Sequence, residues 1–301
     1  MENNKNIIND TVKQVIEHYS KDELIFANER KTLPSRDEII DILQELQQVI
    51  FPGFFNDDEV NSDTAEFFAG SRLVKIYDSL KKQIETALAF SDETSDYRKD
   101  VQASAAMLCD RFFSRLGYIQ DMLSKDIIAE FDGDPAANSK EEVVFCYPGL
   151  FAIYVYRVAH ELYAMDIPLI PRIMSEYVHG KTGIDINPGA VIGEYFFIDH
   201  GTGIVIGETT EIGNNVKLYQ GVTLGALSTR QGQRLSGKKR HPTIGNNVTI
   251  YSNASILGGE TVIGDNCVIG GNTFITSSIP EGTKVVIMEP EMIYIEADGA
   301  E

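Results

Sequence analysis

Residues 182–213 read TGIDINPGAVIGEYFFIDHGTGIVIGETTEIG and place an aliphatic side chain at about every sixth position. The same spacing continues, with interruptions, to residue 276. An α-helix repeats every 3.6 residues and a strand every 2, so neither explains this period. Six-residue repeats of an aliphatic and small residues are typical of a parallel β-helix, in which three repeats make one coil. The stretch therefore predicts stacked coils with aliphatic side chains pointing inward.

The repeated aliphatic positions form four runs, which two phase slips and one long loop separate. They are Ile186, Ile192, Ile198 and Ile204; Ile206, Ile212, Leu218 and Leu224; Ile244, Ile250 and Ile256; and Leu257, Ile263, Ile269 and Ile275. Eight of them are followed by glycine, at Gly193, Gly207, Gly213, Gly225, Gly245, Gly258, Gly264 and Gly270. The slips at 204/206 and 256/257 predict bulges in the coil, and residues 226–242 predict a loop that leaves it.

The rest of the chain differs in pattern from the repeat, so the fold class is α+β. We expect a helical domain at 1–180, the β-helix domain at 181–280 and an acidic tail at 281–301. In the first domain apolar residues recur at helical spacing, and Ser35 and Ser139 each begin a capping box. This domain is expected to pack, to mediate oligomerisation and to supply part of the substrate site.

Arg157 and His160 lie three residues apart in an expected helix over 147–165, so they share one face of it. We interpret them as structural links to the β-helix rather than as catalytic groups.

Composition favours a protein of the cytoplasm. The formal net charge is -19, which argues against nucleic acid or an anionic membrane as the main partner. The three cysteines have neither metal-site nor disulfide spacing, which indicates a reducing compartment. The first residues are polar, unlike a secretory signal, and the apolar stretch 147–171 contains ionisable residues that a membrane span would not tolerate.

The pair Asp199-His200 stands where turn residues of the repeat are expected. Histidine can accept a hydroxyl proton near neutral pH because its unperturbed pKa is about 6.5. Asp185 lies fifteen residues earlier, almost one coil away, where a carboxylate would orient the imidazole. The residues thus predict a general base with an acidic partner. The alternative interpretation is a set of solvated turn residues.

A zinc site and a covalent nucleophile are the two other kinds of site to consider in this sequence. His179, His200 and His241 could in principle bind zinc, but their spacing does not fit paired ligands, so no metal is expected. No serine or cysteine has a neighbouring histidine in a nucleophile pattern, which favours direct transfer over a covalent intermediate. The 226–242 loop carries five basic residues in an acidic chain, so it is either a solvated flap or a flap that meets an anionic ligand.

Five segments in order, 182–190, 197–203, 205–209, 219–225 and 240–245, together resemble the serine O-acetyltransferases. The resemblance covers about residues 132 to 275. It implies a left-handed parallel β-helix and acetyl transfer from acetyl-CoA to the hydroxyl of L-serine, in cysteine biosynthesis. It also implies a homotrimer or a dimer of trimers, with active sites between neighbouring subunits and with L-cysteine as an inhibitor.

The resemblance also implies roles for single residues. His200 is the general base and Asp185 its partner. The serine-binding residues are Asp134 and Asp199 for the amino group, Arg240 and His241 for the carboxylate, and Glu208 near the site. Coenzyme A is expected to lie along the coil edge near Gly225, Ala226, Ser252 and Gly271.

The sequence departs from the family pattern in places. Gly225-Ala226 replaces a pair of glycines, and the loop before Arg240 is about six residues longer than usual, which affects the expected CoA contacts. The chain ends in Asp-Gly-Ala-Glu301 rather than in isoleucine, so we expect weak or absent binding to cysteine synthase through the tail.

Alternatives to a serine acetyltransferase are an acyltransferase for another hydroxyl, on homoserine, a sugar or an antibiotic, and a non-catalytic β-helix scaffold.

Overall fold

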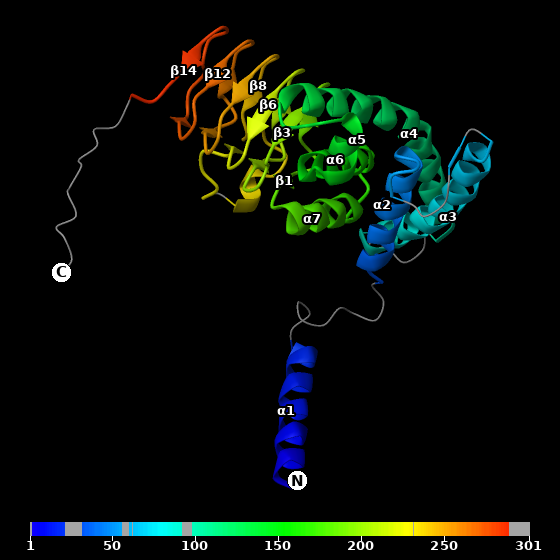
Figure 1. Cartoon of the computed structure of the whole chain (residues 1–301). Coiled ribbons are helices and arrows are strands. Elements are labelled where there is room, and N and C mark those ends of the chain that lie inside the picture. Colours follow the sequence, from blue (N-terminus) through cyan, green and yellow to red (C-terminus); the bar gives the residue numbers. More distant parts are fainter. Residues whose placement is uncertain are drawn as a thin grey trace, which may run out of the picture.

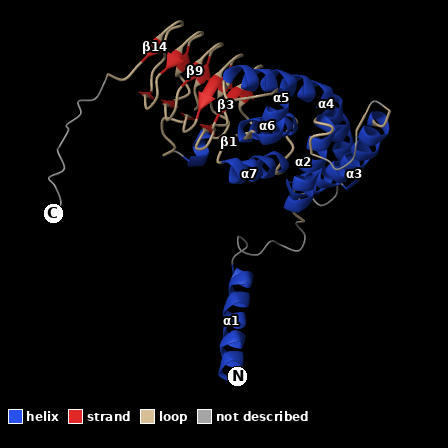
Figure 2. Ribbon diagram, in the orientation of Figure 1, coloured by secondary structure: helices blue, strands red, loops and turns tan. Residues whose placement is uncertain are grey.

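The computed structural model describes residues 2–21, 32–55, 60–61, 63–91, 98–230 and 232–288. The helices between residues 36 and 182 occupy one end of the molecule and a stack of short strands the other (Figures 1 and 2). Helices followed by a β-helix are the expected fold class. Of the expected tail at 281–301, residues 281–288 are described, and Lys284 and Val285 pair with Val268 and Ile269 in the β-helix. Residues 289–301 lie outside the described residues.

The helices of the described ranges follow in chain order. They are α1 (Glu2–Lys21), α2 (Arg36–Ile50), α3 (Ala65–Ser91), α4 (Arg98–Gly133), α5 (Lys140–Cys146), α6 (Pro148–Tyr163) and α7 (Ile170–Thr182). Helix α6 falls within the expected range 147–165, and α2 and α5 begin directly after the expected caps at Ser35 and Ser139. Both predicted caps are present: the side chain of Ser35 accepts from the Glu38 amide, and that of Ser139 accepts from the Glu142 amide. These bonds satisfy N–H groups that have no partner inside the helix.

The strands of the described ranges are two or three residues long and form three parallel sheets. Sheet A contains β1 (Asp185–Ile186), β4 (Val205–Ile206), β7 (Thr223–Gly225), β10 (Ser255–Leu257) and β13 (Phe274–Ile275). Sheet B contains β2 (Val191–Ile192), β5 (Glu211–Ile212), β8 (Thr243–Ile244) and β11 (Val262–Ile263). Sheet C contains β3 (Phe197–Asp199), β6 (Lys217–Tyr219), β9 (Thr249–Ile250), β12 (Val268–Ile269) and β14 (Lys284–Val285). The chain passes through sheets A, B and C in turn, as a β-helix requires.

The repeated aliphatic side chains form the core of the β-helix. Ile206 pairs with Ile186 on one side and with Leu224 on the other, and all three are nearly inaccessible to solvent. The first phase slip coincides with an enlarged corner between β3 and β4. At the second slip the prediction needs a correction: Ile256 occupies the buried position, whereas Leu257 is only half-buried because it follows at the corner.

Helices α4 and α6 cover the first coil of the β-helix, whose outer edge would otherwise expose unpaired backbone groups. On α4, Asp126 accepts from the Phe196 amide at 2.9 Å and Glu130 from the Ile198 amide at 3.1 Å. Both carboxylates are fully buried. The helical domain thus fixes the strand that leads to His200.

Helix α6 supplies donors to the same edge. The Arg157 guanidinium donates to the carbonyl oxygens of Ile192 and Gly193, at 2.7 and 2.6 Å. His160 Nδ1 lies 2.8 Å from the carbonyl oxygen of Pro188. The interpretation of Arg157 and His160 as structural links is confirmed.

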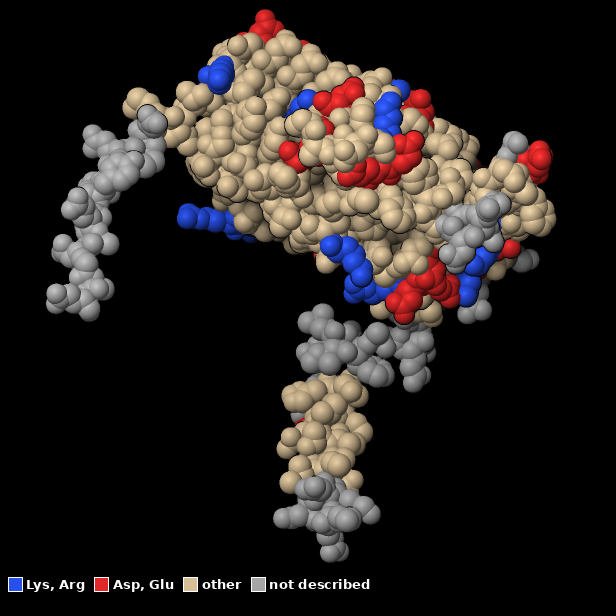
Figure 3. Space-filling view, viewed as in Figure 1, with Lys and Arg blue, Asp and Glu red and all other residues tan. Residues whose placement is uncertain are grey.

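Charge is unevenly distributed over the surface. On the face seen in Figure 3, acidic side chains gather over the helical half, and most of the β-helix surface carries no charge. Among the described helices, no single one is long and apolar enough to cross a membrane. The pair α5 and α6 meets that test only together, with a 73° bend between them.

Candidate active site

One corner of the coil, between sheets C and A, carries three of the predicted site residues. We call it the first corner and define it by four residues. His200 and Gln220 directly follow β3 and β6, and Ser252 and Gly271 are the second residues after β9 and β12. The backbone connects these levels, since the Asn253 amide donates to the carbonyl of Gln220 and the Asn272 amide to that of Ser252. His200 and the predicted CoA residues Ser252 and Gly271 therefore lie in one column.

His200 adopts a left-handed backbone conformation, with φ of 57°. In later coils the first corner places Gly221, Asn253 and Asn272 in this conformation, which glycine and asparagine tolerate more readily than most residues. The histidine side chain is 72% exposed and projects from the corner.

Two carboxylates accompany His200. Asp199 Oδ1 lies 3.5 Å from His200 Nδ1. Asp134 follows α4, and its pKa is lowered chiefly because Tyr147 donates a hydroxyl hydrogen bond of 2.5 Å to it, with smaller contributions from the Ala136 amide and His200. The structure thus brings together Asp134, Asp199 and His200.

Asp185 is separate from this group in the single chain. It begins β1 and pairs in register with Val205. Over the described ranges, no hydrogen bond or ion pair joins Asp185 to His200. Its role as the partner of the base stays a prediction.

A second corner, between sheets A and B, carries the remaining predicted residues. We define it by Glu208 and by the end of the 226–242 loop, Lys239 to His241. Glu208 forms an ion pair with Arg240 and accepts a hydrogen bond of 2.9 Å from the Tyr163 hydroxyl. This pairing is the largest cause of the lowered pKa of Glu208. Gly225 and Ala226 lie where the loop departs from the same corner.

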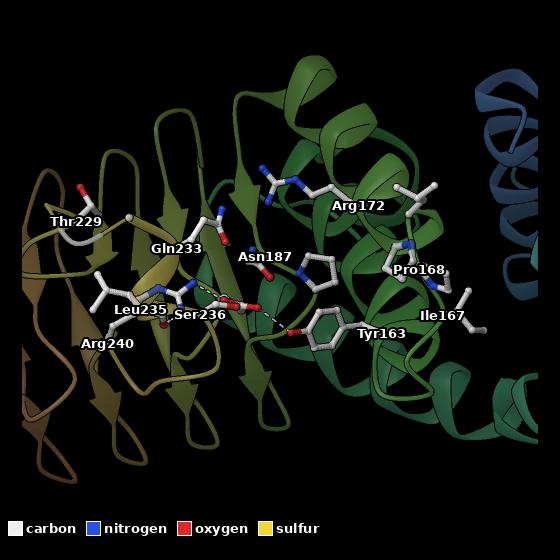
Figure 4. A pocket seen from close by; sticks show the side chains of 15 residues that line it. Tyr163, Ile167, Pro168, Arg172, Asn187, Thr229, Gln233, Leu235, Ser236 and Arg240 are labelled. Atoms are coloured by element: carbon white, nitrogen blue, oxygen red, sulfur yellow. Dashed lines mark hydrogen bonds and ion pairs between the residues drawn. The ribbon is translucent and has the colours of Figure 1, made fainter. Parts of the chain in front are cut away.

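The loop encloses a cavity of about 520 Å³ at this second corner. Figure 4 shows Arg240 and Tyr163 on opposite sides of it, pointing toward the contact that they share with Glu208. Arg172 and Asn187 also line the cavity, and Gln233 comes from the short 3-10 helix η1 (Gly232–Leu235) of the loop. The cavity therefore has a mixed polar and apolar lining that includes the guanidinium groups of Arg172 and Arg240.

The two corners are different edges of a three-sided coil, with sheet A between them. Within the described residues no hydrogen bond, ion pair or cavity lining joins His200 to Arg240 or His241. The base and the expected carboxylate-binding groups are consequently apart in one chain. Two copies that place the first corner of one against the second corner of the other would bring them together.

Known proteins resemble the chain over most of its length. It is 42% identical over 252 residues to a plasmid-borne serine acetyltransferase of Synechococcus elongatus, which covers 80% of this chain and 79% of the relative. The chain belongs to the serine acetyltransferase family. No family model matches it. The fold class, a left-handed parallel β-helix behind a helical domain, and the enzyme class, an acyltransferase, are confirmed.

Solved structures agree with this assignment. The chain superposes on isoform 3 of the Entamoeba histolytica serine acetyltransferase, in complex with cysteine, with a TM-score of 0.72 and 35% identity, covering 97% of this chain and 96% of that chain. It also matches a serine acetyltransferase in complex with CoA, with a TM-score of 0.52 and 26% identity, over 82% of this chain and 96% of that chain.

Sequence reasoning missed several side chains that complete the two corners. Tyr147 fixes Asp134, Tyr163 fixes Glu208, and the Thr209 hydroxyl accepts from the amides of Arg240 and His241. Nothing in the sequence distinguished them, because each acts through a partner at least 13 residues away. No group of three or more His, Cys, Asp or Glu suited to a metal ion occurs in the part of the chain that the structure describes.

His241 is 8% exposed, and its ring lies against Gly207, where an added Cβ would come within 2.1 Å of it. Nδ1 accepts a hydrogen bond of 3.0 Å from the Thr209 amide, so in the neutral ring Nε2 carries the hydrogen. Burial, with help from the neighbouring Arg240 cation, lowers the pKa of His241 from 6.5 to about 4. The neutral imidazole is therefore the form present at neutral pH.

This shift predicts a pH dependence of stability. Between pH 6.5 and about 4 the unfolded state binds more protons at His241 than the folded state, so the free energy of unfolding should rise with pH across that window. The contribution is complete above pH 6.5 and is lost as the pH falls toward 4. We expect urea unfolding from pH 4.5 to 7 to show that the free energy of unfolding rises less steeply with pH in His241→Gln than in wild type. Equal slopes would contradict the shift.

Proposed function

We propose that this chain transfers the acetyl group of acetyl-CoA to the hydroxyl of L-serine, giving O-acetyl-L-serine and CoA for cysteine biosynthesis. The observation that carries the proposal is the pair of corners. One holds His200 beside two carboxylates, and the other holds Arg240 beside neutral His241. An amino-acid acceptor needs an anion for its ammonium group, a cation for its carboxylate and a base for its hydroxyl, and the two corners supply all three.

In the proposed reaction His200 removes the proton of the serine hydroxyl as its oxygen attacks the thioester carbonyl. The tetrahedral intermediate collapses with loss of the CoA thiolate, which takes the proton back from the imidazolium. Asp185 would stabilise that imidazolium, and Asp134 and Asp199 would bind the substrate ammonium. Arg240 and His241 would bind its carboxylate, with Glu208 orienting the guanidinium. A positioned base contributes roughly 100- to 10,000-fold to the rate.

Acetyl-CoA is proposed to lie along the first corner, past Ser252 and Gly271, and to reach Gly225 and Ala226 at the second corner of a neighbouring copy. We therefore propose a homotrimer, alone or paired, with each site between two subunits. L-Cysteine, nearly isosteric with serine, would compete for the same groups, as the cysteine complex of the Entamoeba relative suggests.

Free CoA release, followed with a thiol reagent, tests the substrate pair. Acetyl-CoA with L-serine should give rapid release, whereas homoserine, a sugar alcohol and an aminoglycoside should give little. Release that is faster with one of those acceptors would replace serine in the proposal, and no release with any acceptor would favour a scaffold.

Mixing two inactive variants tests the shared site. His200→Ala and Arg240→Ala, each alone, should lack serine-dependent release. After joint unfolding and refolding, mixed assemblies contain sites in which one subunit supplies intact His200 and its neighbour supplies intact Arg240. Activity should then return to a fraction of wild type. A mixture as inactive as its components would place both residues of a site in one subunit.

A further inference from the structure

Asp126 and Glu130 lie one helical turn apart on α4 and are equally buried, each with 0% exposure. Each accepts a backbone N–H from the segment before His200, Asp126 from Phe196 and Glu130 from Ile198. Asp126 and Glu130 are therefore equivalent in burial and in their contact with the backbone before His200.

Their charge environments differ. Asp126 receives two hydrogen bonds of 3.0 Å from the Arg157 guanidinium, a bidentate ion pair that favours the carboxylate. Burial raises the pKa of Asp126, and Arg157 opposes that rise. No cation pairs with Glu130 in the part of the chain that is described, and its Oε2 has no hydrogen-bond partner there. Burial raises the pKa of Glu130 well above its usual range. The nearby carboxylates of Asp126, Asp199 and Asp134 raise it further.

Glu130 sits at a tight junction of α4, α6 and β3. At Gly149, near the start of α6, an added Cβ would lie 2.6 Å from the Ile198 carbonyl oxygen and 3.3 Å from Glu130 Oε1. Ile198 is itself 2% exposed and directly precedes Asp199 and His200. A shift of Ile198 would therefore move the proposed ammonium-binding carboxylate and the proposed base together.

We propose that Glu130 is a positioning residue which works as an uncharged carboxyl: its Oε1 holds the Ile198 amide and thereby fixes Asp199 and His200. The expected effect of Glu130 on serine turnover rests on the proposed function, in which His200 is the base. The uncharged state of Glu130 does not depend on that function. The neighbouring Asp126 works in the opposite state, as an ion paired with Arg157.

Three variants separate these states. Glu130→Gln has the shape of the neutral acid and keeps a carbonyl oxygen for Ile198, so it should retain the wild-type kcat and KM for serine. Glu130→Leu removes that acceptor and should lower kcat and raise KM for serine, together by up to about a hundredfold in kcat/KM. Asp126→Asn, the same acid-to-amide change one turn away, should lower the Tm because Arg157 loses its counter-charge.

Infrared spectroscopy gives a readout independent of activity. The carbonyl stretch of a protonated, buried carboxyl should be present in wild type and in Asp126→Asn at pH 7, and absent in Glu130→Gln. Its absence from wild type would overturn the uncharged state, as would a Glu130→Gln enzyme as slow as Glu130→Leu. Wild-type kinetics in Glu130→Leu would overturn the positioning role. If the leucine variant does not fold, Glu130→Met provides the same comparison. No serine turnover in wild type, with the infrared band present, would count against the proposed function alone.

Discussion

Replacing His200 with alanine is expected to reduce serine-dependent CoA release by at least about a hundredfold. His200 lies beside Asp134 and Asp199, and an imidazole is a much stronger proton acceptor than a carboxylate, so it is the proposed base at the first corner. The side chain is 72% exposed, so its removal leaves no cavity and the fold should persist. Initial rates at saturating acetyl-CoA and serine, with circular dichroism and Tm, check both statements.

His179→Ala is the matched control for this substitution. His179 lies near the end of α7, and its side chain is 44% exposed. Its Nδ1 is 3.8 Å from Glu176 Oε2. Its loss should leave turnover unchanged. A His200→Ala enzyme that still turns over serine at close to the wild-type rate would remove His200 as the base, whatever its effect on substrate affinity.

Asp126→Asn is expected to lower the free energy of unfolding by about 3–5 kcal/mol. The substitution preserves shape and the acceptor for the Phe196 amide, but it removes the negative charge that compensates Arg157. The guanidinium is 6% exposed and also donates to two backbone carbonyls of the first coil, so it cannot move into water without breaking that edge. Urea unfolding monitored by circular dichroism measures the loss.

Asp121→Asn supplies the comparison on the same helix. Asp121 pairs with Lys125 at 2.7 Å, but its side chain is 60% exposed, and surface ion pairs contribute at most about 1 kcal/mol. Equal losses from the two substitutions would show that burial of the Asp126–Arg157 pair has no special energetic consequence.

The sequence identified the repeat because burial imposes a period. Each inward side chain of a coil must be aliphatic, and each corner must turn, so positions such as Ile192-Gly193 recur regardless of what surrounds the coil. The helices could be predicted because burial also imposes a period on their apolar residues, and because Ser35 and Ser139 cap two of them. The one misplaced position, Leu257, falls at a phase slip, where two neighbouring aliphatics compete for a single buried place.

Only part of the candidate site could be predicted from the residue pattern of the sequence. Asp199-His200 was visible as a polar pair inside an apolar repeat, and the other residues came from motif resemblance. That Ser252 and Gly271 share a corner with His200 depends on register.

The β-helix, its loop, the preceding helices and the polar candidates could be predicted before folding was considered, because they depend on local periodicity and composition. The division of the candidates between two corners depends on the folded chain, since sheet A separates them whatever their order in the sequence. The folded chain alone sets which buried carboxylate has a counter-ion. Asp126 and Glu130 are equivalent in the helical pattern, and the guanidinium of Arg157, brought to one of them by the packing of α6, makes them different.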